Sequence, residues 1–138
     1  MGVKRALTQA ERDFLHEQRF AVLGTTNKNG SAHLTVMWYV LEGDEIMFNT
    51  AAGRKKPDNL TRDPRASLIV PEGYRFVRVD GTVRANDDQT VAQADIRRLA
   101  LRYYQSEERA QRSVDATWAK QHRITYRMAA LRVYSSGF

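Results

Sequence analysis

The residues best suited to chemistry are three consecutive cations, Arg54, Lys55 and Lys56, which stand between two strand-like apolar runs. Gly53 and the small residues before it turn the chain ahead of the cations, and Pro57 follows them. Proline is favoured at the first position of a helix, where its missing N–H is not needed. The free N–H groups at a helix start attract anions. The segment therefore predicts a phosphate site, although a solvated basic turn explains the charges equally well.

A second candidate segment is Val36-Met37-Trp38-Tyr39, which brings aromatic and sulfur side chains into one expected strand. Strand alternation predicts that Val36 and Trp38 share one face and that Met37 and Tyr39 share the other. Many such side chains simply fill a core. Because this strand and the strand before the cations follow each other in hairpins, a flat ring over residues 36–38 with its phosphate on the cations is geometrically consistent.

Other catalytic machinery is missing from the sequence. There is no cysteine, which excludes thiolate nucleophiles and Cys-ligated metals. His16, His33 and His122 have no spacing that forms a metal set, and Ser31 near His33 has no accompanying acid. Neither a Walker A nor a Rossmann glycine pattern is present. If the protein is an enzyme, a cofactor must carry the reaction while protein groups bind and orient it.

Size and charge limit the class of protein. The 138 residues predict one domain spanning residues 1–138, with 42% hydrophobic and 28% charged residues. The net charge is +6, from 22 Lys and Arg against 16 Asp and Glu, which favours anionic partners. No nucleic-acid-binding motif, membrane span or secretory leader is evident, so neither nucleic acid nor membrane is expected as a partner. We expect a cytoplasmic location.

Periodicity predicts mainly β structure with peripheral helices. Six short strands with long alternation favour a closed or nearly closed antiparallel barrel. Strands are expected at residues 20–26, 32–41, 45–50, 65–71 and 74–85 and from Arg123 onward, and helices at 8–18, 57–62, 86–105 and 106–120.

Three details refine this pattern. Thr8 and Glu11 match a capping box at the first helix. The apolar phase of the closing strand slips at Ala129-Ala130, which predicts a bulge or bend. Tyr74 and Phe76 are expected on the polar face of their strand, which suggests that this face meets a partner subunit or a ligand.

Nearly the whole chain resembles the pyridoxamine-phosphate-oxidase-like split β-barrel flavoproteins, and more narrowly the flavin/deazaflavin oxidoreductases that use coenzyme F-420. The segments that carry the resemblance are Val22–Thr25, Asn29-Gly30, Ala32–Tyr39, Gly53–Ser67, Val79–Thr82 and the closing strand. The resemblance implies a six-stranded antiparallel split β-barrel of the FMN-binding type. It also implies a homodimer with two cofactor sites at the subunit interface.

The resemblance assigns binding roles but no proton donor. It places Arg54 and Lys56 on the cofactor phosphate, with Lys55 beside them and Asn59 in support. Backbone contacts would come from the turn, and other side chains would border the ring or approach from the second subunit. The turn residues are Thr50, Ala51, Ala52 and Gly53; the ring residues are His33, Val36, Met37 and Trp38; the partner-side residues are Tyr74 and Phe76.

The expected function is that of an F-420-dependent reductase moving hydride between the deazaflavin and a small conjugated organic substrate. A surplus of Arg and Lys suits the polyglutamate tail of F-420, but FMN would use the same Arg54 and Lys56. The alternatives are an FMN-binding oxidoreductase and a non-catalytic flavin- or haem-binding protein. His33 is weak as a haem ligand, and a nucleic-acid-binding module lacks any motif.

Overall fold

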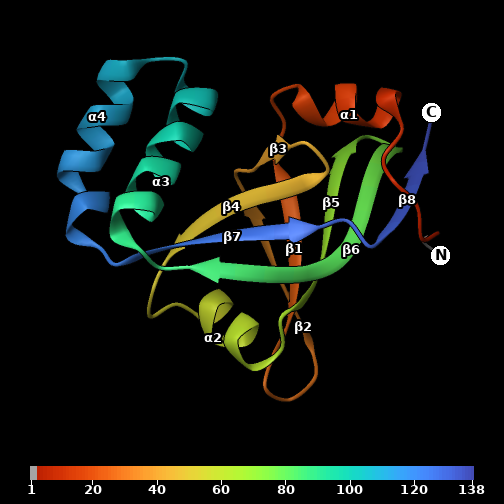
Figure 1. Ribbon diagram of the computed structural model, residues 1–138, viewed down its shortest axis with the longest axis horizontal. Helices are drawn as coiled ribbons and strands as arrows, with labels where there is room; N and C mark the ends of the chain where they lie inside the picture. The colour runs from red at the N-terminus through yellow and green to blue at the C-terminus, as the bar shows by residue number, and fades with distance from the viewer. Residues whose placement is uncertain (1–2) are drawn as a thin grey trace.

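An antiparallel sheet curls through the molecule and carries its helices at the margins (Figure 1). The computed structural model describes residues 3–138. The strands are β1 (Ala21–Thr26), β2 (Ala32–Met37), β3 (Val40–Glu42), β4 (Glu45–Ala51), β5 (Arg65–Glu72), β6 (Arg75–Asn86), β7 (Arg123–Ala129) and β8 (Arg132–Ser136). The helices are α1 (Gln9–His16), α2 (Lys55–Arg62), α3 (Gln89–Tyr104) and α4 (Glu107–Ala116), with the 3-10 helix η1 at Trp118–Lys120.

The strand order is β2-β1-β5-β6-β7-β4-β3, and β8 pairs with β6. Within the described residues the two end strands, β2 and β3, do not pair with each other. The sheet is thus a curled half-barrel of the split-barrel type, mainly β with peripheral helices as predicted, and it is not closed. All six predicted strands form, but two of them are interrupted, so the sheet contains eight.

The predicted strand 32–41 breaks at Trp38 and Tyr39, because both side chains are drawn into tertiary contacts. Trp38 stacks on Tyr103 of α3 with ring centroids 5.1 Å apart. The hydroxyl of Tyr39 donates to the carbonyl of Leu15 at 2.8 Å. The prediction that Val36 and Trp38 share a face is therefore wrong: Val36 is 69% exposed, whereas Trp38 packs against α3.

The closing strand bends where the change of phase predicted. Strand β7 ends at Ala129 and β8 begins at Arg132, and between them the Leu131 N–H donates to the carbonyl of Asp80 at 2.9 Å. Gly81 of β6 lies against this bend. A Cβ atom at Gly81 would stand 2.0 Å from the carbonyl oxygen of Ala129, so only glycine permits the crossing.

Apolar side chains fill both sides of the β4–β7 pair. Phe48 and Tyr126 stack at 5.2 Å inside the curl. On the other side Met47 packs with Ile96 and Leu99 of α3. This second layer attaches α3 to the sheet, and α4 packs on α3, on the left of Figure 1.

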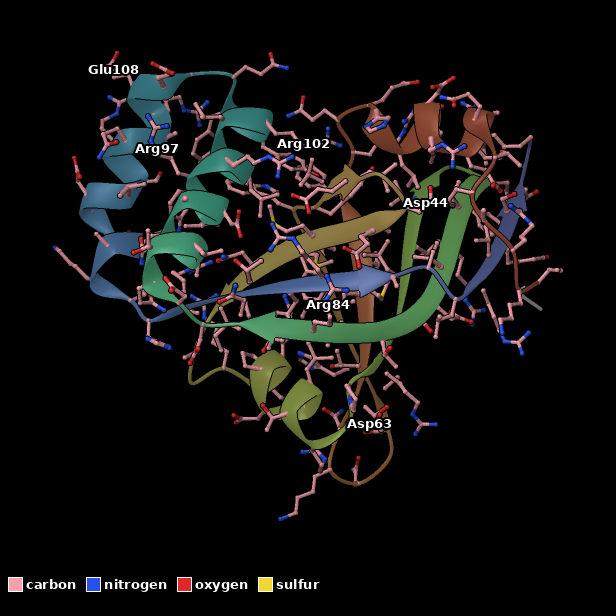
Figure 2. The ribbon with its side chains drawn as sticks, viewed as in Figure 1. Asp44, Asp63, Arg84, Arg97, Arg102 and Glu108 are labelled. Atoms are coloured by element: carbon pink, nitrogen blue, oxygen red, sulfur yellow. The ribbon has the colours of Figure 1, made fainter. Side chains whose placement is uncertain are left out.

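Helix α1 begins with the predicted capping box: Thr8 accepts from the Glu11 N–H, and Glu11 accepts from the Thr8 N–H. Its other end is held by Arg102, which Figure 2 shows between α3 and α1. Arg102 donates to the carbonyls of His16 at 2.8 Å and Glu17 at 2.9 Å, which lack partners within the helix.

Glu11 generates a prediction about pH. Its side chain is 1% exposed and accepts two 2.7 Å bonds from Arg5, and these bonds lower the Glu11 pKa from 4.5 to about 2. Because the folded pKa lies below the unfolded one, the stabilisation is complete above about pH 4.5 and is lost as the pH falls toward 2. Glu11→Gln should cost about 2 kcal/mol of unfolding free energy at pH 7 and less at pH 3.

Urea unfolding at the two pH values measures this difference. Glu108→Gln is the control, because its carboxylate is 82% exposed at the outer edge of α4 (Figure 2) and should contribute little at either pH. A cost of Glu11→Gln that is the same at both pH values would contradict the assignment.

Candidate functional site

The basic turn leads into an uncapped helix start. Gly53 has a left-handed φ of +83° and turns the chain after β4. Helix α2 then begins at Lys55, two residues earlier than predicted, so Pro57 occupies the third helical position. Arg54 is the N-cap residue, and no side chain accepts a hydrogen bond from the first turn. Because proline is tolerated anywhere in a first turn, the helix extends back over the cations and presents its open N-terminus beside them.

The start of β7 brings a further cation to this turn. Arg123 lies opposite Ala51 in the β4–β7 register, and the N–H of Ala52 donates to the carbonyl of His122 at 2.8 Å. The Arg123 side chain is only 4% exposed. In the sequence Arg123 is only the first residue of a predicted strand, and no local signal marks it as part of a site.

Arg54, Lys56 and Arg123 form what we call the cationic cluster. Burial lowers the pKa of Lys56, and the nearby charges of Arg54 and Arg123 lower it further. Burial and the charge of Arg54 likewise lower the pKa of Arg123 to about 10. Within residues 3–138 no carboxylate forms a salt bridge with any of the three. The cluster thus combines two partly desolvated cations, Lys56 and Arg123, with the exposed Arg54 and a helix N-terminus, an arrangement that favours an anion.

Asn59 fixes the position of α2, the helix at whose start the cluster lies. Its side chain is 2% exposed; its amide nitrogen donates to the hydroxyl of Thr25 at 3.1 Å and to Asn27 at 3.0 Å. Its amide oxygen accepts from Arg62 at 2.9 Å. Because both ends of the amide are engaged by protein, Asn59 binds α2 to the β1–β2 hairpin.

The turn residues divide between core and surface. Thr50 and Ala51 are buried at the end of β4, on opposite faces of the strand. Ala52 and Gly53 are exposed beside the cationic cluster. Of the four predicted turn residues, Ala52 and Gly53 are therefore the two that a ligand can reach.

The predicted ring residues do not make one surface. His33 and Met37 point to the inner side of β2, and Val36 points outward, because alternate residues of a strand face opposite ways. Trp38 lies beyond the strand, against α3. Edge strand β2 therefore offers a ligand either its inner or its outer side chains, and Trp38 belongs to neither row.

Tyr74 and Phe76 lie far from the cluster of their own chain. Tyr74 occupies the β5–β6 turn, not the predicted strand, and is 97% exposed. Strand β5, eight residues or about 25 Å long, separates this turn from the end of α2 (Figure 1). Phe76 packs against Tyr134 of β8 at 5.5 Å. Only a second subunit would bring these aromatics to a cluster.

Among residues 3–138 no group of three or more histidines and carboxylates is arranged to hold a metal ion, and His122 lies 3.5 Å from Asp87 alone. In the same range no helix has the length and apolarity needed to cross a membrane.

Replacing Asn59 tests its structural role. Asn59→Ala should lower the unfolding free energy by about 1–3 kcal/mol, because it leaves the buried Thr25 hydroxyl and its neighbours without partners. Urea unfolding provides the measurement, with Asn29→Ala in the exposed hairpin turn as control. Equal losses for the two variants would show that Asn59 does not secure α2.

Comparison with solved structures gives relatives of the same fold. The conserved hypothetical protein Rv2991 from Mycobacterium tuberculosis is 29% identical, with a TM-score of 0.78 over 95% of this chain and 87% of that chain. A structure described as an F420 reductase is 19% identical, with a TM-score of 0.76 over 94% of this chain and 100% of that chain. The haem storage protein HutZ from Vibrio cholerae is 15% identical, with a TM-score of 0.73 over 97% of both chains.

Among curated proteins the comparison gave no match. The family model described as pyridoxamine 5'-phosphate oxidase matches residues 7–127, from just before α1 into β7. That range includes β1 to β6, the basic turn and all three members of the cationic cluster. The chain belongs to the pyridoxamine 5'-phosphate oxidase family, whose split-barrel fold it has.

Proposed function

We propose that this protein is an F-420-dependent reductase that moves hydride between the deazaflavin and a small conjugated organic substrate. The observation that carries the proposal is the cationic cluster at the open N-terminus of α2, to which no carboxylate of residues 3–138 forms a salt bridge. In a family whose fold serves flavin-type cofactors, such a site suits a cofactor phosphate.

The choice of F-420 is supported by two further observations. One solved structure of the same fold is described as an F420 reductase, and it aligns with 94% of this chain and 100% of its own. The net charge of +6 suits a cofactor with a polyanionic tail. FMN would occupy the same cations and is the principal alternative.

The haem-binding alternative has less support. It rests on the likeness to HutZ, which is 15% identical. Of the three histidines, His16 is exposed on α1 and His122 lies beside Asp87, which leaves His33 on the inner side of β2. Among the described residues, His33 belongs to no group of three or more histidines and carboxylates that could hold a metal ion.

The chain's own part in the reaction is binding and orientation. Bound F-420 would supply the hydride chemistry. Arg54 and Lys56 would hold its phosphate, and the exposed Gly53 with the uncapped first turn of α2 would offer backbone N–H groups. Asn59 would keep α2 in place behind them. No side chain is assigned as a proton donor.

The active form in this proposal is a homodimer with the cofactor at the subunit interface. On the outer face of the β2-β1-β5-β6 sheet, apolar side chains of β2 are uncovered: Leu34 is 65% and Val36 69% exposed. Next to them a groove of about 630 Å³ runs between β1, β5 and the β7–β8 bend. A second copy seated here would cover the apolar side chains and bring its own Tyr74 and Phe76 toward the ligand.

A direct titration tests the cofactor. Both tryptophans lie in the aromatic cluster beside α3 and α4, so fluorescence polarisation of the cofactor itself is a more direct signal than tryptophan quenching. We expect F-420 to bind at micromolar concentration and more tightly than FMN. If FMN binds and F-420 does not, the cofactor is FMN and the F-420 assignment is wrong.

Charge removal tests the phosphate site. Arg54→Ala and Lys56→Ala should each weaken F-420 binding by about 2 kcal/mol, because each loses a charge-assisted contact. Arg112→Ala, which removes the same charge from the exposed face of α4, is the control. Affinity that falls equally in all three variants would reflect total charge and not a site.

A charge on the outer face tests the dimer. Leu34→Asp should convert a dimer to monomers, because it places a carboxylate in an apolar interface. Sedimentation analysis of the wild-type and variant proteins measures the change. A wild-type protein that is monomeric at tens of micromolar would refute the proposed assembly.

A further inference from the structure

Arg123 is a buried cation whose side-chain partners are all neutral. Its Nε donates to the amide oxygen of Asn49 at 2.9 Å, and its Nη1 donates to that of Gln121 at 2.6 Å. No hydrogen bond from Nη2 to any residue in the described range accompanies these two. Buried charges in proteins are usually paired with an opposite charge. The positive charge of Arg123 and its Nη2 atom therefore have no partner among residues 3–138, and an anionic ligand could engage both.

Arg127 provides an internal comparison. It lies four residues further along β7 and points to the same side of the strand. Its Nε donates to Glu42 at 2.9 Å and its Nη1 to Asp95 at 3.4 Å, and Glu42 raises the Arg127 pKa. The same strand thus carries one arginine that is neutralised by carboxylates and one that is not.

The neutral partner of Arg123 is itself fixed by buried hydrogen bonds. The amide nitrogen of Asn49 donates to the carbonyl of Ala92 at 2.9 Å and to the hydroxyl of Thr125 at 3.0 Å. That hydroxyl donates to the buried carboxylate of Asp95 at 2.8 Å. These hydrogen bonds fix the Asn49 amide so that its oxygen accepts from Arg123. In this chain of bonds the neutral side chains of Asn49 and Thr125 stand between Arg123 and the Asp95 carboxylate. The guanidinium is thus held without being neutralised.

We infer that Arg123 is a third ligand of the phosphate bound by Arg54 and Lys56, and that Asn49 and Gln121 position it. The inference rests on the proposed function and extends it, because it adds a residue from a distant strand to the phosphate site. It also defines the ligand class: a phosphate ester whose charge balances cations from both α2 and β7.

Inorganic pyrophosphate is a suitable probe, since it carries the phosphate charge without a flavin ring. Isothermal titration should show binding to the wild-type protein at up to millimolar concentration. Arg123→Gln should weaken that affinity about tenfold or more, because a charge-assisted contact is lost. Arg127→Gln, the matched control, should leave the affinity within about twofold, since Arg127 is already neutralised. Unchanged affinity in Arg123→Gln, or no pyrophosphate binding by the wild type, would overturn the inference.

Gln121→Glu tests the same point without removing Arg123. The substitution keeps the size of the side chain and the acceptor at 2.6 Å, but it converts a neutral partner into a carboxylate. Neutralising the guanidinium should weaken pyrophosphate binding while the melting temperature stays the same or rises. A purely structural Arg123 predicts the rise in melting temperature with no loss of affinity, and that result would contradict the inference. This variant carries the test if Arg123→Gln does not fold.

Titration of F-420 into the same variants separates this inference from the proposed function. If pyrophosphate binding depends on Arg123 but F-420 does not bind, the anion site stands and the cofactor assignment fails. If F-420 binds the wild type and Arg123→Gln equally well, the cofactor assignment stands and the role of Arg123 is refuted.

Discussion

Strand β6 determines how the rest of this molecule is arranged, because both halves of the sheet share it. Residues Arg75–Thr82 pair with β5, and Val83–Asn86 pair with β7. At the junction Gly81 lets the carbonyl of Ala129 approach to where a side chain would otherwise stand. The chain can therefore cross over β6 and continue as β8. In the register of β7 against β4, Arg123 lies opposite Ala51, which places it beside the basic turn.

The cationic cluster destabilises the folded chain, because its cations repel one another and two of them are partly buried. This cost points to a function for the cluster. Several other arginines of this protein pair with carboxylates: Arg5 with Glu11, Arg84 with Glu45 and Arg127 with Glu42. In the cluster, desolvation and mutual repulsion lower the pKa values of Lys56 and Arg123. Natural sequences break such local rules mainly at functional sites. An anionic ligand would turn the same repulsion into binding energy.

Much of the fold could be predicted because its signals are local. Strand alternation, the capping box of Thr8 and Glu11, and the change of phase at Ala129 each involve residues a few positions apart. The breaks in the pattern have distant causes. Tyr103, over sixty residues away, draws Trp38 out of its strand. The open first turn of α2 admits Pro57 at its third position, so the helix starts before the proline that suggested its beginning.

Only the part of the candidate site on α2 could be predicted from the sequence; the part on β7 could not. Arg54 and Lys56 stand in a conspicuous local run, so charge and turn pattern identified them. Arg123 gave no such signal, because its burial depends on Asn49, 74 residues earlier, and on Gln89, whose side chain accepts from its N–H across 34 residues. The inner and outer rows of β2 were likewise predictable, whereas the side that meets a ligand depends on the second subunit.

The most direct test of this account is a crystal structure of the protein with F-420 bound. The account predicts that the cofactor phosphate lies at the N-terminus of α2, within hydrogen-bond distance of Arg54, Lys56 and Arg123. Density that places the phosphate away from α2, or on α2 with the Arg123 guanidinium turned toward a protein carboxylate, would contradict it.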